Sequence, residues 1–507
     1  MKTLKRITAG FLCLLMILSA GCAAAEEHPQ EAAVQGAAEI APAAEAEEED
    51  TTDAYGRELI PSAVPADLRF DGETFTVLSR YDANIFDIQN EFLAESRNGE
   101  PINDAVFTRN SEVEDQLGVK LAVEFCAYPE YDTKARTSYK AGDAAYDIYS
   151  FYAYYGVALA LEGIFANLLT QPVLDLSKPW WNQNFIDEMT LKDQLYFIAG
   201  DLSLSGLECT HAVFFNKQLL ASYLNGVDLY GAVDEGTWTA DYFSSLVNGV
   251  YTDTDGDGTR DEDDLYGVVM HAVSIPIDSF LDAFDLAVTT RGEDGLPKLT
   301  YMNERTISAY EKLYALCHEN SGSYFGQQTL EFYWFAQDKF RDGQSVFLLD
   351  IFQATDKLRE MTDDYGVLPL FKYDEAQSDY YTNVADVYSL MALSSVTQDR
   401  EALGAVFELL GQKSYDYVIP AYFEVALKQK YARDNIDAKM YDRVLAGCRY
   451  NFGFVYSVQI GSVIHLWRTL LNSKSKDFVS SFKSQEKVLN KQLNKLIDKY
   501  DSIETGD

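Results

Sequence analysis

The most specific chemical motif in the sequence is an acidic loop with the spacing of a calcium site. Aspartates occupy positions 1, 3, 5, 9 and 12, with glycine at position 6: Asp253, Asp255, Asp257, Asp261 and Asp264, and Gly258. Ca²⁺ takes about six to eight oxygen ligands, and this spacing lets the carboxylates and the Thr259 carbonyl converge. We expect a structural Ca²⁺ site, although Asp264 stands where a longer Glu usually binds with both oxygens. A solvated acidic turn is the alternative.

Motifs of the common catalytic classes are missing from the sequence. It contains no GxSxG elbow, HExxH helix or phosphate-binding glycine loop, and its Cys and His positions suggest no nucleophile pair. Because 80 acidic residues guarantee close carboxylate pairs by chance, such pairs are no sign of a glycoside hydrolase. We therefore predict a protein that is not an enzyme and has no catalytic cofactor, with a glycoside-active enzyme as a less favoured alternative.

The overall charge excludes some partners. Lys and Arg number 41 against 80 Asp and Glu in 507 residues, a net charge of −39. Such a chain is repelled by a phosphate backbone and by anionic lipid, so nucleic acid is excluded as a partner. The length suits two large lobes or about three domains.

The first 53 residues are predicted to be a targeting signal followed by a tether. Residues 1–21 form a secretory signal peptide, with a basic start and an apolar run that is too short to span a membrane. The small residues before Cys22 resemble a bacterial lipobox, although Ser19 replaces the usual Leu, so we expect Cys22 to be lipidated. Residues 22–53 are rich in Ala and Glu and read as a disordered acidic tether. The body, residues 54–507, would then lie outside the membrane, anchored to it by lipid.

Strands and helices alternate along this body, which predicts an α/β fold with a mainly parallel sheet. Strands are expected at 74–79, 119–125, 147–151 and 212–216, and helices at 103–116, from Lys217 and from 237 onward. A terminal helix carries Phe482, Leu489, Leu493, Leu496 and Tyr500 at helical spacing. Cys126, Cys209, Cys317 and Cys448 could pair in three ways, but buried free thiols are the favoured interpretation.

Several segments, in order, resemble the motifs of a known family. They are Pro101–Val106 with Arg109 and Asn110, Phe214–Lys217, Thr237–Thr239, Phe340–Phe352 and Tyr365–Leu370. Together with the lipoprotein start, they are similar to the bacterial extracellular solute-binding proteins of ABC importers, in the carbohydrate-type family 1.

The resemblance implies a type II periplasmic-binding-protein-like fold, with discontinuous lobes, a hinge and a ligand cleft between them. We place the N-lobe at about 54–200 plus 340–385 and the C-lobe at about 201–339 plus 386–507, with crossings near 199–212 and 330–345. It also implies a monomer that captures a sugar or oligosaccharide by lobe closure and delivers it to a permease. Another solute or peptide, or a role as a surface sensor, stays open.

A sugar needs aromatic planes for its C–H faces and planar polar groups for its hydroxyls, placed where strands end. The candidate ligand contacts are Arg80, Tyr81, Tyr152, Tyr154, Tyr155, Trp180, Trp181, Asp201, Trp334, Asp350, Phe352, Asp386 and Tyr388. Tyr152 to Tyr155 are expected in a loop after the third strand, and Asp350 and Phe352 stand where the family places ligand contacts. Paired Trp near a Pro more often pack in a core, and any one of the many Tyr can be structural.

Overall fold

The computed structural model describes residue 52 and residues 57–81, 91–271, 274–326, 329–423 and 435–503. Residues 51–507 form one compact unit, and it alone is described here. The predicted signal peptide (1–21), the predicted lipidation site Cys22 and nearly all of the predicted tether (22–53) lie outside the described residues. Among those described, no helix combines the length and apolar character that a membrane span requires.

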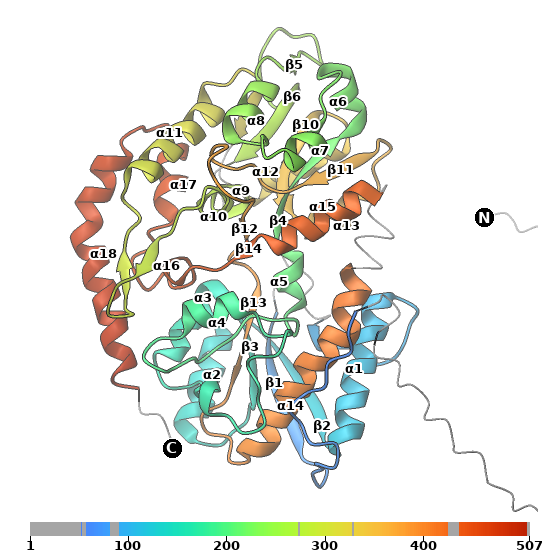
Figure 1. Ribbon diagram of the computed structural model, residues 1–507, viewed down its shortest axis with the longest axis vertical. Helices are drawn as coiled ribbons and strands as arrows, with labels where there is room; N and C mark the ends of the chain where they lie inside the picture. The colour runs from blue at the N-terminus through green and yellow to red at the C-terminus, as the bar shows by residue number, and fades with distance from the viewer. Residues whose placement is uncertain are drawn as a thin grey trace, which may run out of the picture. The chain divides into compact units, whose positions relative to one another are not determined.

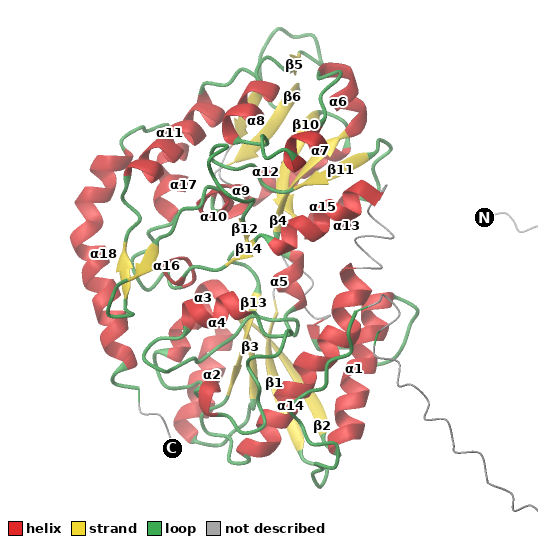
Figure 2. Cartoon of the chain, in the orientation of Figure 1, coloured by secondary structure: helices red, strands yellow, loops and turns green. Residues whose placement is uncertain are grey.

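The first lobe is built around a four-stranded sheet with the order β13-β3-β1-β2 (Figure 2). β1 pairs in parallel with both β2 and β3, and β13 joins the edge of β3 in antiparallel register. The elements of this part of the chain are β1 (Thr74–Tyr81), α1 (Pro101–Leu117), β2 (Lys120–Ala127), α2 (Glu130–Ala141), β3 (Ile148–Tyr152), α3 (Ala153–Ala160), η2 (Leu168–Thr170) and α4 (Gln183–Met189), with β13 (Ser389–Leu393), α14 (Arg400–Lys413) and η4 (Ser414–Val418) added from later in the sequence. The predicted strands and first helix are confirmed to within about two residues.

The second lobe is built around a larger mixed sheet. Its strand order is β11-β4-β10-β6-β5, and β9 pairs with β6. Before β10 the chain forms α5 (Leu204–Glu208), β4 (His211–Asn216), α6 (Lys217–Tyr223), α7 (Leu229–Asp234), α8 (Ala240–Val247), β5 (Tyr251–Thr252), β6 (Leu265–His271), α9 (Ser274–Ile277), α10 (Ser279–Ala283), β7 (Thr289–Arg291), β8 (Pro297–Leu299), α11 (Glu304–His318), β9 (Ser323–Gly326) and α12 (Leu330–Arg341). The helices predicted from Lys217 and from 237 onward are present as α6 and α8, and the side chains of Asn216 and Thr239 cap them.

The remainder of the chain completes both lobes. It comprises β10 (Ser345–Ile351), η3 (Phe352–Ala354), α13 (Thr355–Leu358), β11 (Tyr365–Leu368), β12 (Thr382–Asn383), α15 (Asn435–Ala446), β14 (Cys448–Arg449), α16 (Phe452–Val455), α17 (His465–Asn472) and α18 (Phe478–Tyr500). β12 and β14 pair in parallel as a two-stranded sheet. Within the described residues, the four cysteines are free thiols, three of them buried, as expected.

The predicted division between the lobes is wrong after residue 339. β10 and β11, which we assigned to the N-lobe, pair with β4 in the second sheet, and β13, which we assigned to the C-lobe, pairs with β3 in the first. The crossing near 199–212 is present, since the chain passes between the sheets ahead of β4. The return takes place between β11 and β13 and not near 330–345. Strands that are buried on both faces carry no polar side, so the sequence could not indicate which sheet receives them.

The terminal helix α18 lies along both lobes, as Figure 1 shows. It packs on α17 and β8 of the second lobe. Its last turn reaches the first lobe, where Tyr500 packs on Tyr196 at 5.6 Å between ring centroids and Asp501 forms an ion pair with Lys192. The buried residues Leu489, Leu493 and Leu496 confirm the apolar face that the spacing predicts.

Candidate functional site

Four tyrosines gather at the carboxyl ends of the first sheet, and we call Tyr128, Tyr152, Tyr154 and Tyr155 the tyrosine cluster. Tyr128 and Tyr155 stack at 4.2 Å between centroids, 9° from parallel. Tyr154 meets Tyr155 edge-on at 4.5 Å, and Tyr152 lies 5.3 Å from Tyr155. Tyr128 directly follows β2 and Tyr152 ends β3, so the parallel strands bring them together.

The cluster rests on a helix, so the loop predicted after β3 is wrong. α3 begins at Ala153, immediately after the strand, and carries Tyr154 and Tyr155 in its first turn. Adjacent helical residues point about 100° apart, which directs the two rings to different neighbours. Burial raises the pKa of both phenols, so they are neutral hydrogen-bonding groups near pH 7.

Arg80 adds a cation at the end of β1. Its guanidinium carbon lies 4.8 Å from the centroid of the Tyr152 ring. Nε donates to Ser389 Oγ at 2.9 Å, and Nη2 donates to the Val387 carbonyl, which ties the end of β1 to the segment that enters β13. Tyr81, the next residue and the last of β1, is 37% exposed. The buried Arg80 therefore stays fixed beneath the cluster.

The second lobe meets the cluster at His465, the first residue of α17. The Tyr154 hydroxyl and His465 Nε2 are 3.1 Å apart and hydrogen-bonded, and the two rings are 14° from parallel with centroids 5.6 Å apart. Burial, and then the charge of Arg468, lower the pKa of His465 to about 4. The imidazole is therefore neutral at pH 7.

Arg468 follows one turn later and binds two carboxylates. Its Nε donates to Asp278 Oδ1 at 2.7 Å, Nη2 donates to Asp278 Oδ2, and Nη2 lies 3.3 Å from Asp386 Oδ2. Asp386 belongs to the segment that returns to the first lobe, so the network joins α17 to that crossing. The two positive charges of Arg80 and Arg468 thus equal the two negative charges of Asp278 and Asp386, and the charge of this part of the site is balanced.

The structure brings together five of the thirteen predicted contacts: Arg80, Tyr152, Tyr154, Tyr155 and Asp386. Tyr128, Asp278, His465 and Arg468 also belong to this group and were not predicted from the sequence. Tyr128 had a weak signal, because it lies three residues beyond the predicted strand 119–125, and the observed strand β2 extends to Ala127. His465 and Arg468 had none, since a helix near the C-terminus reaches the site only through the tertiary fold.

Trp180 and Trp181 are core residues, so their prediction as ligand contacts is wrong. Both are fully buried. Trp181 stacks on Phe407 at 4.9 Å between centroids, and its Nε1 donates to Glu408 Oε2 at 3.1 Å. Apolar area drives such large rings inward, and the Pro-preceded turn is covered by α14.

Phe352 and Asp350 also point into the second lobe. Phe352 is fully buried and packs on Tyr441 at 5.1 Å, so its prediction as a ligand contact is wrong. Asp350 Oδ1 accepts hydrogen bonds from Tyr333 Oη and its own strand's Ile351 N, and Oδ2 accepts one from Gln337 Nε2. Burial raises its pKa to about 6. Its carboxylate is occupied by protein donors, as a buried charge requires, and does not face the cluster.

Trp334 lies on α12, away from the tyrosine cluster. Its ring meets Tyr333 at 4.7 Å between centroids, and Lys357 Nζ lies 5.7 Å from the ring centroid. The ring is half-buried. The structure therefore places it on the second lobe beside Asp350 and leaves it out of the group around Tyr154.

Asp201 and Tyr388 line a different, small pocket of about 180 Å³ together with Cys448 and Tyr450. It lies where the segments that cross between the lobes run side by side. Burial raises the pKa of Asp201 to about 7. The Tyr388 hydroxyl is buried and makes no hydrogen bond within the described part of the chain. Both residues are therefore near the hinge and outside the tyrosine cluster.

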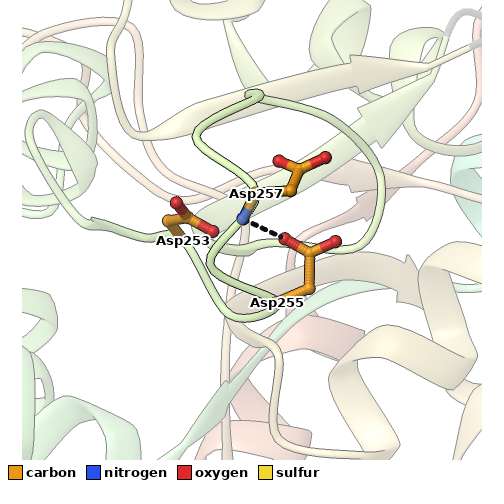
Figure 3. Close-up of side chains that lie close together, drawn as sticks. All are labelled: Asp253, Asp255 and Asp257. Carbon is orange, nitrogen blue, oxygen red and sulfur yellow. Dashed lines mark hydrogen bonds between the residues drawn. The ribbon is translucent and has the colours of Figure 1, made fainter.

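The acidic loop brings three of its six predicted ligands together (Figure 3). One carboxylate oxygen each from Asp253, Asp255 and Asp257 lies within 4.8 Å of the others. Gly258 turns the chain with φ +76°, a conformation that favours glycine. The loop is held by Asp253, whose two oxygens accept from the amides of Gly256 and Gly258.

The later ligands of the predicted set take other partners. Asp264 is buried and accepts from Tyr251 Oη at 2.8 Å, Thr254 N at 3.0 Å and Asp261 N at 3.2 Å, so it closes the base of the loop. Asp261 accepts from the Asp263 amide, and the Thr259 amide donates to Asp257. Asp261 and Asp264 thus lie outside the three-carboxylate group.

Comparisons with known proteins give the fold. A scan of protein-family models found no match, and neither did a search of curated proteins. Many solved structures are similar, including UspC of M. tuberculosis, with TM-score 0.54, 17% identity, and coverage of 83% of this chain and 100% of that one.

A cyclo/maltodextrin-binding protein complexed with maltotetraose gives TM-score 0.52 and 14% identity over 87% of this chain and 99% of that one. A family 1 extracellular solute-binding protein from Bifidobacterium longum subsp. infantis gives 0.51 and 13% over 84% and 100%. At this identity the likeness establishes the fold: the chain has the two-lobe α/β fold of solute-binding proteins.

Proposed function

We propose that this protein is the extracellular substrate-binding component of an ABC importer and captures a sugar or oligosaccharide between its lobes. The observation that carries the proposal is the tyrosine cluster, which stands at the carboxyl ends of parallel strands and faces His465 of the second lobe. Several accessible rings side by side offer planes for the C–H faces of pyranose rings. The phenol hydroxyls, the imidazole and the guanidinium groups supply hydrogen-bond partners for hydroxyls.

The charges around the cluster favour a neutral ligand. Arg468 is engaged by Asp278 and Asp386, and Arg80 is engaged by Ser389 and Val387. Burying an unpaired charge is costly. A charged ligand would therefore need a protein group of opposite charge that has no other partner in this half-buried site. The similar cyclo/maltodextrin-binding protein holds maltotetraose, which is a neutral oligosaccharide.

In this proposal the protein binds and does not catalyse. Capture occurs when the lobes close on the ligand, and the contact between Tyr154 and His465 stabilises the conformation in which the lobes touch. The closed form would be presented to the permease subunits, and the lipid on Cys22 would hold the body at the outer face of the membrane by the acidic tether. The body would act as a monomer.

A thermal-shift and calorimetric screen of the whole protein tests the proposal. Maltotetraose, other neutral oligosaccharides, peptides and polyamines are added in turn, because a ligand that binds the folded form raises the melting temperature. We expect a shift with at least one saccharide, and at least tenfold weaker binding by the Tyr154→Ala variant. Tyr223→Ala, which removes an exposed ring on α6, is the matched control. A shift with peptides or polyamines alone, or turnover of a saccharide, would contradict the proposal.

We also propose that the acidic loop binds a structural Ca²⁺ ion. The DxDxDG spacing and the convergence of Asp253, Asp255 and Asp257 support it. The ion would be held by these carboxylates and would fix the loop that leads into β6. Ligand capture at the tyrosine cluster does not need it.

A further inference from the structure

The second lobe contains a pocket of about 700 Å³ that the proposed function does not use. It opens beside β9, which among the described strands pairs only with β6. Residues of β9 and of the first half of α12 form its walls, and the C-terminal ends of α11 and α17 complete it. Its volume is in the range of small-ligand sites, about 300–1,000 Å³.

The pocket is separate from the tyrosine cluster. His465 at the start of α17 contacts Tyr154, whereas Asn472 at the end of the same helix lines the pocket. Seven residues of α-helix at about 1.5 Å each put roughly 10 Å between these positions along the helix axis. A ligand in the pocket would therefore have its own contacts.

Aromatic rings form the pocket walls and are held in place by packing. The ring of Phe332 lies against Gly326, where a Cβ atom would come within 1.8 Å of the ring. Phe335 lies 5.3 Å and Tyr324 6.0 Å from Phe332, centroid to centroid. Phe325 meets the His318 ring at 4.8 Å. Tyr324, Phe325 and Phe335 stay half-buried, so their rings are partly accessible.

The rim carries polar groups of both signs. Glu262, Glu331 and Lys474 are exposed, and Asn472 adds an amide. Mixed charge is a poor match for an ion of either sign, and this polar rim is a poor match for a purely apolar ligand. Aromatic planes bordered by carboxylates, an amide and an ammonium group match a ring with C–H faces and hydroxyl edges.

We propose that this pocket is a second carbohydrate-binding site, distinct from the cleft. Phe335 and Tyr324 supply the stacking surfaces, and Glu331 and Lys474 bind hydroxyls at the rim. The pocket lies on the second lobe, which also forms one side of the cleft. An oligosaccharide bound in the pocket stays near the cleft after its other end dissociates from the tyrosine cluster, which raises its effective concentration at the cleft.

The test separates the two sites with variants of the full-length protein. Saturation-transfer NMR is recorded with maltotetraose, cellotetraose, xylotetraose and mannotetraose on four proteins: wild type, Tyr154→Ala, Tyr154→Ala with Phe335→Ala, and Tyr154→Ala with Val488→Ala as an exposed-residue control on α18. We expect at least one tetrasaccharide to bind Tyr154→Ala. That binding should weaken at least tenfold with Phe335→Ala and stay within twofold with Val488→Ala.

A rim variant guards against a folding defect. Glu331→Ala with Lys474→Ala changes only exposed side chains. Introduced into the Tyr154→Ala protein, these two substitutions should also weaken its tetrasaccharide binding at least fivefold, with an unchanged melting temperature. If Tyr154→Ala binds none of the four sugars, or if its binding is indifferent to the pocket variants, the second site is refuted. The proposal for the cleft is tested separately, by whether saccharides bind the wild type more tightly than they bind Tyr154→Ala.

Discussion

The hydroxyl of Tyr154 and Nε2 of His465 lie 3.1 Å apart and join the first lobe to the second. Tyr154 is placed by the strand-to-helix junction of β3 and α3, and His465 by the start of α17. Their rings are nearly parallel, so the pair combines a hydrogen bond with a stacking contact. A contact that exists only while the lobes touch biases the hinge equilibrium toward that state.

Removing the hydrogen bond should therefore weaken ligand binding without removing a ring. For Tyr154→Phe we expect the loss of about 0.5–1.5 kcal/mol from the lobe-to-lobe contact, which raises the apparent Kd about two- to twelvefold. Calorimetry with the saccharide found by screening measures it. His465→Gln should have a similar effect, and the double variant should add little to either single one, because the two residues share one interaction. Full additivity would show that the pair is not coupled.

The histidine also predicts a dependence of stability on pH. Its pKa of about 4 in the folded protein is below the usual value of about 6.5. The folded state therefore binds this proton only at a lower pH than the unfolded chain does. Its contribution to the free energy of unfolding is fully present above pH 6.5 and is lost as the pH falls toward 4.

Urea unfolding of wild type and His465→Gln between pH 8 and 4 measures this contribution. His211 and His271 have pKa values lowered to about 4 and about 3 by burial and act in the same direction, so only the difference between the two proteins isolates His465. That difference should shrink below pH 6.5. A difference that is constant with pH, or an NMR titration of His465 near 6.5, would contradict the assignment.

Glu408 is expected to matter for stability and not for binding. Its buried carboxylate accepts from Trp181 Nε1 and from the backbone amides of Ala63 and Asp175. Glu408→Ala leaves these donors without their partner, so the free energy of unfolding should fall by about 2–4 kcal/mol. Glu486→Ala on the exposed face of α18 should change it by less than about 0.5 kcal/mol. If folded Glu408→Ala lost ligand affinity, Trp181 would contribute to the ligand site after all.

The calcium proposal predicts a metal-dependent melting temperature. Ca²⁺ at a hundredfold excess over its Kd should stabilise the wild type by about 2.7 kcal/mol relative to chelator. Asp253→Asn with Asp257→Asn should abolish the increase, whereas Asp263→Asn, in the same loop but outside the spacing, should keep it. Scanning calorimetry with Ca²⁺ and with chelator distinguishes the cases, and an equal loss of stability in chelator would reject the site.

The sequence alone predicted the alternation of strands and helices, the starts of α6 and α8 and the apolar face of α18, because these depend on local periodicity and caps. It also placed Arg80 and Tyr152 directly after predicted strands, and parallel strands gather such residues at one edge of a sheet. Four of the predicted contacts, Arg80, Tyr152, Tyr154 and Tyr155, lie together at that edge in the structure.

Only the tertiary structure decided which sheet receives β10, β11 and β13, since strands buried on both faces fit either sheet equally well by pattern. It also decided that Trp181 and Phe352 enter the core, and that Asp350 is satisfied by Tyr333 and Gln337. His465 lies 311 residues from Tyr154 along the chain. No local pattern encodes a contact at that separation, because it exists only once the lobes have folded and met.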